Sequence, residues 1–193
     1  SDVSVKEGTN ATFSVAVNNG YPASTTYQWQ KATNLQSGNT VANVSSSGVD
    51  STGRYMIKKS TDSWYGGVYL NNTSVKAGKT YTWSMEVYST QAFNARYDTN
   101  CNADNYSGND NAMSSSTPSS AGVAIPANTW TKIYVTCTIK SDATNPVLNH
   151  SFCPTPGVAE FKMYYRNSEL VEDSSWTNIS GATGASYTVA TPT

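Results

Sequence analysis

Apolar and polar residues alternate in short runs along most of the chain. Between residues 80 and 88, the apolar side chains Tyr81, Trp83, Met85 and Val87 occupy every second position. A period of two is typical of a strand with one buried face, and similar runs occupy residues 11–18, 25–31, 54–58, 67–70, 93–98, 129–140, 160–165 and 186–190. No stretch of ten or more residues keeps the apolar spacing of a helix. The pattern predicts an all-β protein.

One segment departs from this alternation. Residues 99–120 are nearly all small or polar, which predicts a surface loop, mobile or functional. Oxygen-bearing side chains occupy every second position from Asp98 to Asp104, as in calcium loops, but the glycine and the final glutamate of an EF-hand are missing. A solvated loop is favoured over a calcium site, and no metal or cofactor is assigned.

Composition narrows the classes of partner. The chain has 193 residues, enough for one large or two small β domains, with 13% charged residues and a net charge of -1. Such a chain offers no basic face for phosphates, so nucleic acid is not expected as a partner. The sequence contains no run of about 18 apolar residues, so membrane insertion is not expected. The N-terminal residues carry no export signal, so the localisation cannot be read from them.

The three cysteines do not form a metal-site or disulfide pattern. Cys137 shares a predicted strand face with Val135 and Ile139, which favours a buried, inert thiol. Cys101 and Cys153 both lie in polar, turn-rich sequence. A disulfide between them and two separate thiols are equally compatible with the sequence.

Catalytic chemistry is poorly supported. The one histidine, His150, lies in the polar stretch LNHSF and is predicted to be a turn or surface residue. No GxSxG motif or phosphate-binding glycine loop is present, and nothing in the sequence brings the strand carboxylates Glu86 and Glu160 together. The sequence therefore predicts a protein that is not an enzyme.

The two ends of the chain carry one family resemblance. VSVKEGTNATFSVAVNNGYPASTTYQWQK (residues 3–31) resembles the opening of a bacterial or phage immunoglobulin-like domain, in which Trp29 packs in the sandwich core. The partner line of that family, WTNISGATGASYTV, stands at residues 176–189. The resemblance implies a discontinuous domain, residues 1–33 and 173–193, interrupted by a second domain. Two further strands are expected after Val189, so the sandwich appears incomplete at the C-terminus.

The intervening residues 34–172 have a different resemblance. The segments SWYGGVYLNNTSVKAGKTYTWSMEVYS (63–89), IPANTWTKIYVTCTI (125–139) and EFKMYYRNSELVE (160–172) are similar, in order, to jelly-roll carbohydrate-binding modules of glycoside hydrolases and phage tail proteins. An inserted jelly-roll β-sandwich is implied. Related modules often hold a structural calcium, so that ion is retained as an alternative. Domain insertion is tolerated at exposed loops whose ends are close.

Aromatic residues supply the candidate binding site. Flat rings stack on the apolar faces of sugars, while amides, carboxylates and arginine bond the hydroxyls. Trp29, Trp83 and Trp176 occupy predicted packing positions, and Trp130 is also expected to be structural. The six candidates for carbohydrate binding share an exposed, turn-rich or loop-proximal setting: Trp64, Tyr65, Tyr88, Arg96, Tyr97 and Tyr106.

The resemblances together predict a non-catalytic adhesion module of a phage tail or fibre that binds host-surface saccharide. Its partners would be a cell-surface polysaccharide or glycan and other virion or surface-filament proteins, and its location the virion surface or the extracellular space. Two alternatives stay open. One is a structural or decorating spacer in a virion or filament, and the other is an accessory module of a secreted polysaccharide-degrading enzyme.

Overall fold

A computed structural model describes residues 10–15, 26–36, 38–59, 66–102, 113–116, 123–154 and 160–189, and for 96–102, 113–116 and 123 it describes the backbone. Every regular element in these ranges is a strand, which confirms the all-β prediction. None of the described residues forms a helix long and apolar enough to cross a membrane. The chain divides into two compact units, one of residues 1–32 and 176–193 and one of residues 33–175.

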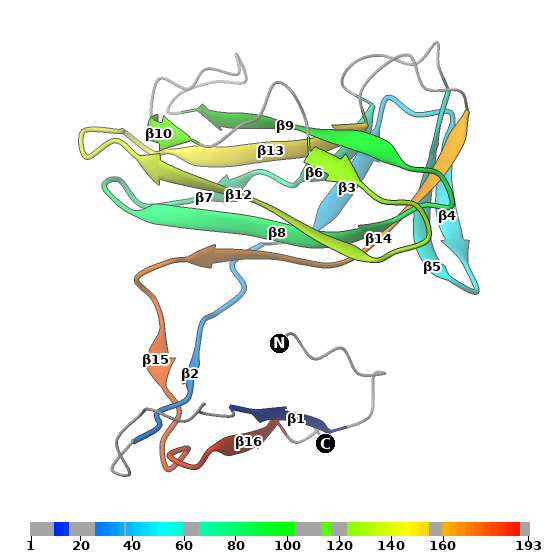
Figure 1. Cartoon of the computed structure of the whole chain (residues 1–193). Helices are drawn as coiled ribbons and strands as arrows, with labels where there is room; N and C mark the ends of the chain where they lie inside the picture. The colour runs from blue at the N-terminus through cyan, green and yellow to red at the C-terminus, as the bar shows by residue number, and fades with distance from the viewer. Residues whose placement is uncertain are drawn as a thin grey trace. The chain divides into compact units, whose positions relative to one another are not determined.

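The larger unit is a sandwich of two antiparallel sheets (Figure 1). The first, called here the β8 sheet, has the order β10 (Met113–Ser116), β12 (Thr131–Ile139), β8 (Thr80–Tyr88), β14 (Phe161–Glu172), β5 (Gly53–Lys58) and β4 (Ser46–Asp50). The second, the β13 sheet, has the order β11 (Val123–Ile125), β9 (Phe93–Asn102), β13 (Val147–Pro154), β6 (Gly67–Leu70) and β3 (Asn39–Ala42), with β7 (Thr73–Ser74) also paired to β13. From β11 onward successive strands alternate between the sheets, as in a jelly roll.

The core lies between the two sheets and follows the alternation of the sequence. Trp83 of β8 and Phe152 of β13 are at most 1% exposed, and their rings stack with centroids 4.3 Å apart. Met85 and Val87 also point inward and have no exposed surface, as predicted. Because a buried aromatic ring removes a large apolar area from water, truncating Trp83 to alanine would cost about 3–5 kcal/mol. Cys137 is 1% exposed, so the prediction of a buried thiol is confirmed.

The prediction for His150 is wrong. It lies inside β13 with no exposed surface, and its ring stacks on Trp83 at a centroid distance of 5.9 Å. In β13, Leu148 and Phe152 flank it on the core face, while Asn149 and Ser151 occupy the other positions of the alternation. The strand was not predicted from the sequence, because the polar His150 interrupts the alternating apolar positions Leu148 and Phe152.

The predicted loop at 99–120 is also partly strand. The backbone of β9 continues to Asn102, and β10 within this segment pairs with β12. In the register of β9 and β13, Cys101 lies opposite Leu148 and Cys153 opposite Arg96. The two cysteines are therefore about five residues apart along the strands, roughly 16 Å at strand spacing. A disulfide between them is excluded, because it requires Cα atoms within about 7 Å.

In the smaller unit, the two ends of the chain pair with each other. β1 (Ala11–Ser14) pairs with β16 (Ser186–Val189), and β2 (Gln30–Lys31) pairs with β15 (Thr177–Asn178). Trp29 lies between the rings of Phe13 and Tyr187, with both centroids 6.3 Å away, and its indole donates to the carbonyl of Gly184. The segment expected to follow the Trp29 strand is thus the one that bonds to it.

Trp176 differs from its predicted packing role. Its side chain is 52% exposed. It lies just before the short strand β15, whose two residues are both exposed. This strand therefore has no buried face on which Trp176 could pack. The family pattern identified the segment but not the environment of its first residue.

Candidate functional site

The outer face of the β13 sheet carries a half-exposed tyrosine. In β6, Val68 and Leu70 point into the core and are at most 1% exposed, so Tyr69 between them points outward. Tyr69 lies opposite Thr40 of β3 on one side and Ser151 of β13 on the other. Directly opposed residues share a face in an antiparallel pair. A phenol ring is thus held on the sheet between two hydroxyl-bearing neighbours.

A hollow of about 380 Å³ surrounds this ring. Asn149 of β13 donates to the side-chain oxygen of Asn72 at 3.0 Å, and the hydroxyl of Thr40 donates to the side-chain oxygen of Asn71. These bonds fix the orientation of the amides at the rim. The full lining is Thr40, Ala42, Tyr69, Leu70, Asn71, Asn72 and Asn149.

The hollow is neutral and rich in hydrogen-bonding groups. Its lining contains no ionisable side chain except the phenol of Tyr69. Each asparagine can both donate and accept, as can Thr40 and Tyr69. An aromatic ring bordered by amides and hydroxyls matches a ligand with an apolar face and a rim of hydroxyl groups. The arrangement suits recognition and contains no nucleophile paired with a base.

The sequence-predicted site residues fall in different places. Trp64, Tyr65 and Tyr106 lie outside the described residues, so their role stays a prediction. Arg96 and Tyr97 lie on β9, the strand next to β13, with their backbones opposite Cys153 and Phe152. The strand of Arg96 therefore belongs to the same sheet as Tyr69.

Tyr88 belongs to the opposite sheet. It is the last residue of β8 and points to the opposite face from its inward-facing neighbour Val87. Its ring belongs to a row of half-buried rings on the outer face of the β8 sheet. The row, called here the outer row, runs across four neighbouring segments, with centroids 6.1, 6.0 and 5.4 Å apart, in the order Tyr55, Tyr164, Tyr88 and Trp130. Tyr88 thus does not extend the surface around Tyr69.

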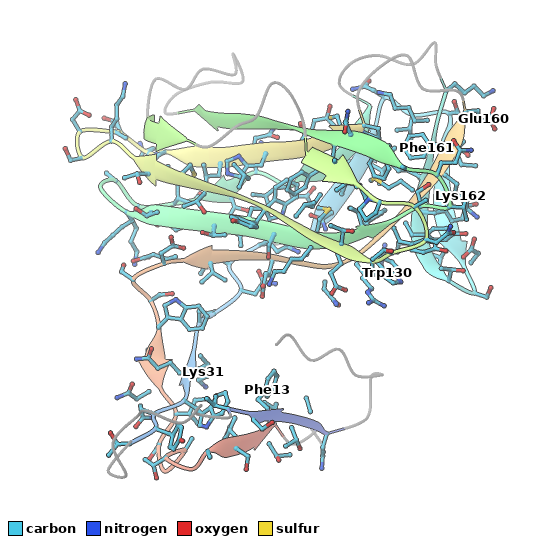
Figure 2. All side chains as sticks on the ribbon, viewed as in Figure 1. Phe13, Lys31, Trp130, Glu160, Phe161 and Lys162 are labelled. Atoms are coloured by element: carbon cyan, nitrogen blue, oxygen red, sulfur yellow. The ribbon has the colours of Figure 1, made fainter. Side chains whose placement is uncertain are left out.

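Cations cover part of the outer row. Lys162 Nζ lies 3.8 Å from the ring centroid of Tyr55, and the guanidinium carbon of Arg166 lies 3.9 Å from that of Trp130. Lys162 and Trp130 are labelled at the same end of the β8 sheet (Figure 2). Cation–π contacts of this kind stabilise the surface by about 0.5–1 kcal/mol each. Because the cations occupy ring faces, we interpret the outer row as cross-strand packing, in line with the structural role expected for Trp130.

Each cation also has a carboxylate partner. Arg166 Nε lies 2.6 Å from Glu86 Oε2, and Lys162 pairs with Asp50. The bond from Lys162 lowers the pKa of Asp50 to about 2 and raises the pKa of Lys162 itself. Both pairs are neutral overall, which leaves no net charge on the outer row.

The described part of the chain brings together neither the two strand carboxylates nor a set of metal ligands. Glu86 is engaged by Arg166, whereas Glu160 lies before β14 and pairs with Lys59 at 3.9 Å. Arg166, the cross-strand partner of Glu86, is six residues further along β14 than Glu160, about 20 Å at strand spacing. Among the described residues, no group of three or more His, Cys, Asp and Glu could hold a metal ion.

Sequence reasoning missed the residues that line the hollow. Asparagine is so frequent in this chain that the sequence did not single out the three at the hollow, Asn71, Asn72 and Asn149. The available signal was Tyr69 itself, an aromatic residue between two core positions of a correctly predicted strand. The amides become visible only when β3, β6 and β13 are placed side by side.

Comparison with known proteins identifies the fold. No family model matches the chain, and no curated protein matches it. A solved structure of a carbohydrate-binding module, CBM4, aligns with a TM-score of 0.50 and 13% identity, covering 70% of this chain and 95% of that one. The larger unit therefore has the jelly-roll fold of such a module.

Two further structures show weaker similarity. A sugar-binding protein of Bacteroides thetaiotaomicron gives a TM-score of 0.42 and 12% identity over 80% of this chain and 90% of that one. The CBM22-1–GH10 modules of Clostridium thermocellum endo-1,4-β-D-xylanase 10B, complexed with xylohexaose, give 0.39 and 12% over 76% of this chain and 29% of that one.

Proposed function

We propose that the protein is a non-catalytic module that binds a neutral saccharide on the outer face of its β13 sheet. The observation that carries this proposal is the uncharged hollow of about 380 Å³ around Tyr69, bordered by three asparagines. Sugars present apolar C–H faces to a ring and hydroxyls to amides, so both parts of the ligand find a partner there. The jelly-roll fold supports the proposal, because solved members of that fold include a carbohydrate-binding module.

The proposed surface continues toward the sequence-predicted residues. Arg96 belongs to β9, which pairs with β13 along eight residues, at the position opposite Cys153, whereas the position of Tyr97 is opposite the core residue Phe152. Trp64 and Tyr65 precede β6 in the chain. A saccharide longer than one ring would extend from Tyr69 across β13 in this direction. Arg96, Trp64 and Tyr65 would then supply further stacking and hydrogen-bonding groups.

The biological setting that we propose is adhesion by a phage tail or fibre on the virion surface. The immunoglobulin-like resemblance of residues 3–31 and 176–189 supports this setting, as do the phage tail proteins among the similar jelly-roll modules. Other virion proteins and a host-surface glycan would be the partners. Repetition on a symmetric particle would add avidity, so a single module need bind only weakly.

The test is a glycan array probed with the full chain displayed as a multimer. We expect binding to neutral glycans and a loss of about tenfold in affinity for Tyr69→Ala, since removing a stacking ring costs on the order of 1.4 kcal/mol. The matched control is Tyr134→Ala, because Tyr134 is 61% exposed on β12 of the opposite sheet. Trp64→Ala examines the predicted extension separately.

Absence of binding on the array, or equal binding by the Tyr69 and Tyr134 variants, would refute the saccharide site and favour a structural spacer. The surrounding gene separates the two remaining settings. Tail-protein sequence beside this chain supports virion adhesion, whereas a neighbouring catalytic domain supports an accessory module of a polysaccharide-degrading enzyme.

A further inference from the structure

A second pocket lies at an irregularity of β14. The pairing of β14 with β8 shifts between Arg166 and Glu169, and Asn167 in this bulge adopts a left-handed backbone with φ of 50°. The bulge opens a pocket of about 310 Å³, lined by Gln36, Asn39, Arg54, Tyr165, Arg166, Asn167 and Ser168. This lining shares no residue with the hollow around Tyr69.

Three side chains of this pocket have unused hydrogen-bond donors. Arg54 is exposed, and its side chain makes no ion pair or hydrogen bond with any described residue. Tyr165 is only 7% exposed, yet its hydroxyl also has no described partner. That hydroxyl is not sealed in the core, because His150 Nδ1 is the one fully buried side-chain polar atom left without a partner in the described part of the chain. Asn39 Oδ1 lies 3.2 Å from Ser168 Oγ and shares the one hydroxyl hydrogen with the closer Gln36 Oε1, while the NH₂ group of Asn39 has no described acceptor.

Other lining residues of the pocket are held in place by a hydrogen-bond network centred on Ser168. The buried indole of Trp83 donates to Ser168 Oγ at 3.0 Å, and Ser168 Oγ in turn donates to Gln36 Oε1 at 2.9 Å. Gln36 returns a bond to the carbonyl of Ser168 at 2.8 Å. Because these groups are fixed before any ligand arrives, little conformational entropy is lost on binding.

The pocket has positive charge without a compensating acid in its lining. Two arginines and no carboxylate are among the seven lining residues. Glu86 neutralises Arg166 from outside the pocket, at 2.6 Å, but Arg54 has no such partner among the described residues. An arginine fork beside neutral donors is the arrangement that binds a planar or tetrahedral oxyanion.

We propose that this pocket binds an oxyanion, with Arg54 as the charged contact and Tyr165 and Asn39 as neutral donors. The chemistry fits the carboxylate of a uronic acid, and it fits a free inorganic oxyanion equally. The volume suits a single sugar ring or smaller, at the lower end of ligand pockets. This site is independent of the neutral saccharide site, so either can exist without the other.

The experiment is an NMR titration of the ¹⁵N-labelled full chain at low ionic strength. Sodium glucuronate is the saccharide probe, glucose is its uncharged counterpart, and sodium sulfate is the inorganic probe. We expect shifts of the arginine Nε–H signal that is missing in Arg54→Gln, saturation with glucuronate but not with glucose, and weaker binding as salt is added. Arg54→Gln should weaken binding about tenfold or more, and Tyr165→Phe about threefold to tenfold.

The matched control is Lys140→Gln, which removes one positive charge at the end of β12 and outside the pocket lining. Tighter binding of glucuronate than of sulfate would identify an acidic saccharide as the ligand. Equal binding of the two anions would identify a general oxyanion site. Either outcome supports the proposal. Failure of both anions to saturate the Arg54 signal overturns it. Equal losses in Arg54→Gln and Lys140→Gln also overturn it, because they would indicate only a nonspecific effect of net charge. Binding of neutral glycans through Tyr69 would be unaffected by either result.

Discussion

His150 is the only histidine of the chain, and its burial predicts how stability depends on pH. Burial lowers the pKa of His150 from its ordinary value of 6.5 to about 3. Its ring lies between Trp83 and Cys137, whose Sγ is 3.6 Å from Nε2, and no carboxylate is among its described contacts. The folded protein thus keeps this imidazole neutral under conditions where an exposed histidine is charged.

The size of the pH effect on the free energy of unfolding follows from the difference in His150 protonation between the folded and the unfolded chain. Above pH 6.5 the imidazole is neutral whether the chain is folded or unfolded, so its contribution is fully present. As the pH falls below 6.5, the unfolded chain binds a proton that the folded chain does not bind until about pH 3. The free energy of unfolding therefore decreases by about 1.4 kcal/mol per pH unit, or about 2 kcal/mol between high pH and pH 5.

Urea unfolding between pH 7.5 and pH 5, followed by near-ultraviolet circular dichroism, measures this slope. His150→Phe should remove most of the slope whatever its effect on absolute stability, since no other side chain ordinarily titrates in this interval. Asp50, with its pKa near 2, contributes to acid destabilisation only below this range, as the pH falls through about 4. In the proton NMR spectrum, the His150 ring signals should stay unshifted from pH 7.5 to 5. A titration midpoint near 6.5, or an equal slope in the phenylalanine variant, would refute the buried neutral imidazole.

Two further substitutions test the packing. Gly67→Ala should destabilise by more than about 2 kcal/mol, because an added Cβ would lie 2.1 Å from a backbone carbonyl of β13, whereas Gly184→Ala meets no atom closer than 3.4 Å and should be tolerated. Thermal unfolding of the two variants compares them, and equal changes would contradict the tight contact. Ser168→Ala should cost about 1–3 kcal/mol in urea unfolding because the indole of Trp83 loses its acceptor, while the exposed Ser47→Ala should change stability by less than about 0.5 kcal/mol. A neutral Ser168→Ala would show that the network does not stabilise the fold.

The strongly alternating parts of the fold were predictable. The bounds of β6 and β8 agree with the runs at 67–70 and 80–88, because in each strand buried apolar residues at alternate positions face the core. β13 was missed, since His150 replaces an apolar residue at a core position. β3 and β4 were also missed, because their exposed and half-exposed residues give no apolar period.

The candidate site was less predictable than the fold. An aromatic residue on a strand can be recognised locally, and Tyr88 was selected in this way, but its sheet depends on pairing between distant segments. The hollow around Tyr69 combines β3, β6 and β13, which are separated by up to about a hundred residues. Register between such segments is decided by the packed core and is not encoded in any one of them.

The ends of the larger unit are held together by its own contacts, and this has a consequence for the order of folding. The amide of Leu35 donates to the carbonyl of Leu170 at 2.8 Å, close to both points where the chain enters and leaves the unit. Pairing Lys31 with Thr177 in an otherwise unfolded chain would close a loop of roughly 145 residues, at an entropic cost of about 4 kcal/mol. Once the larger unit has folded, most of that cost has already been met. The strands β2 and β15 then begin close to each other, so the smaller unit should fold after the larger one.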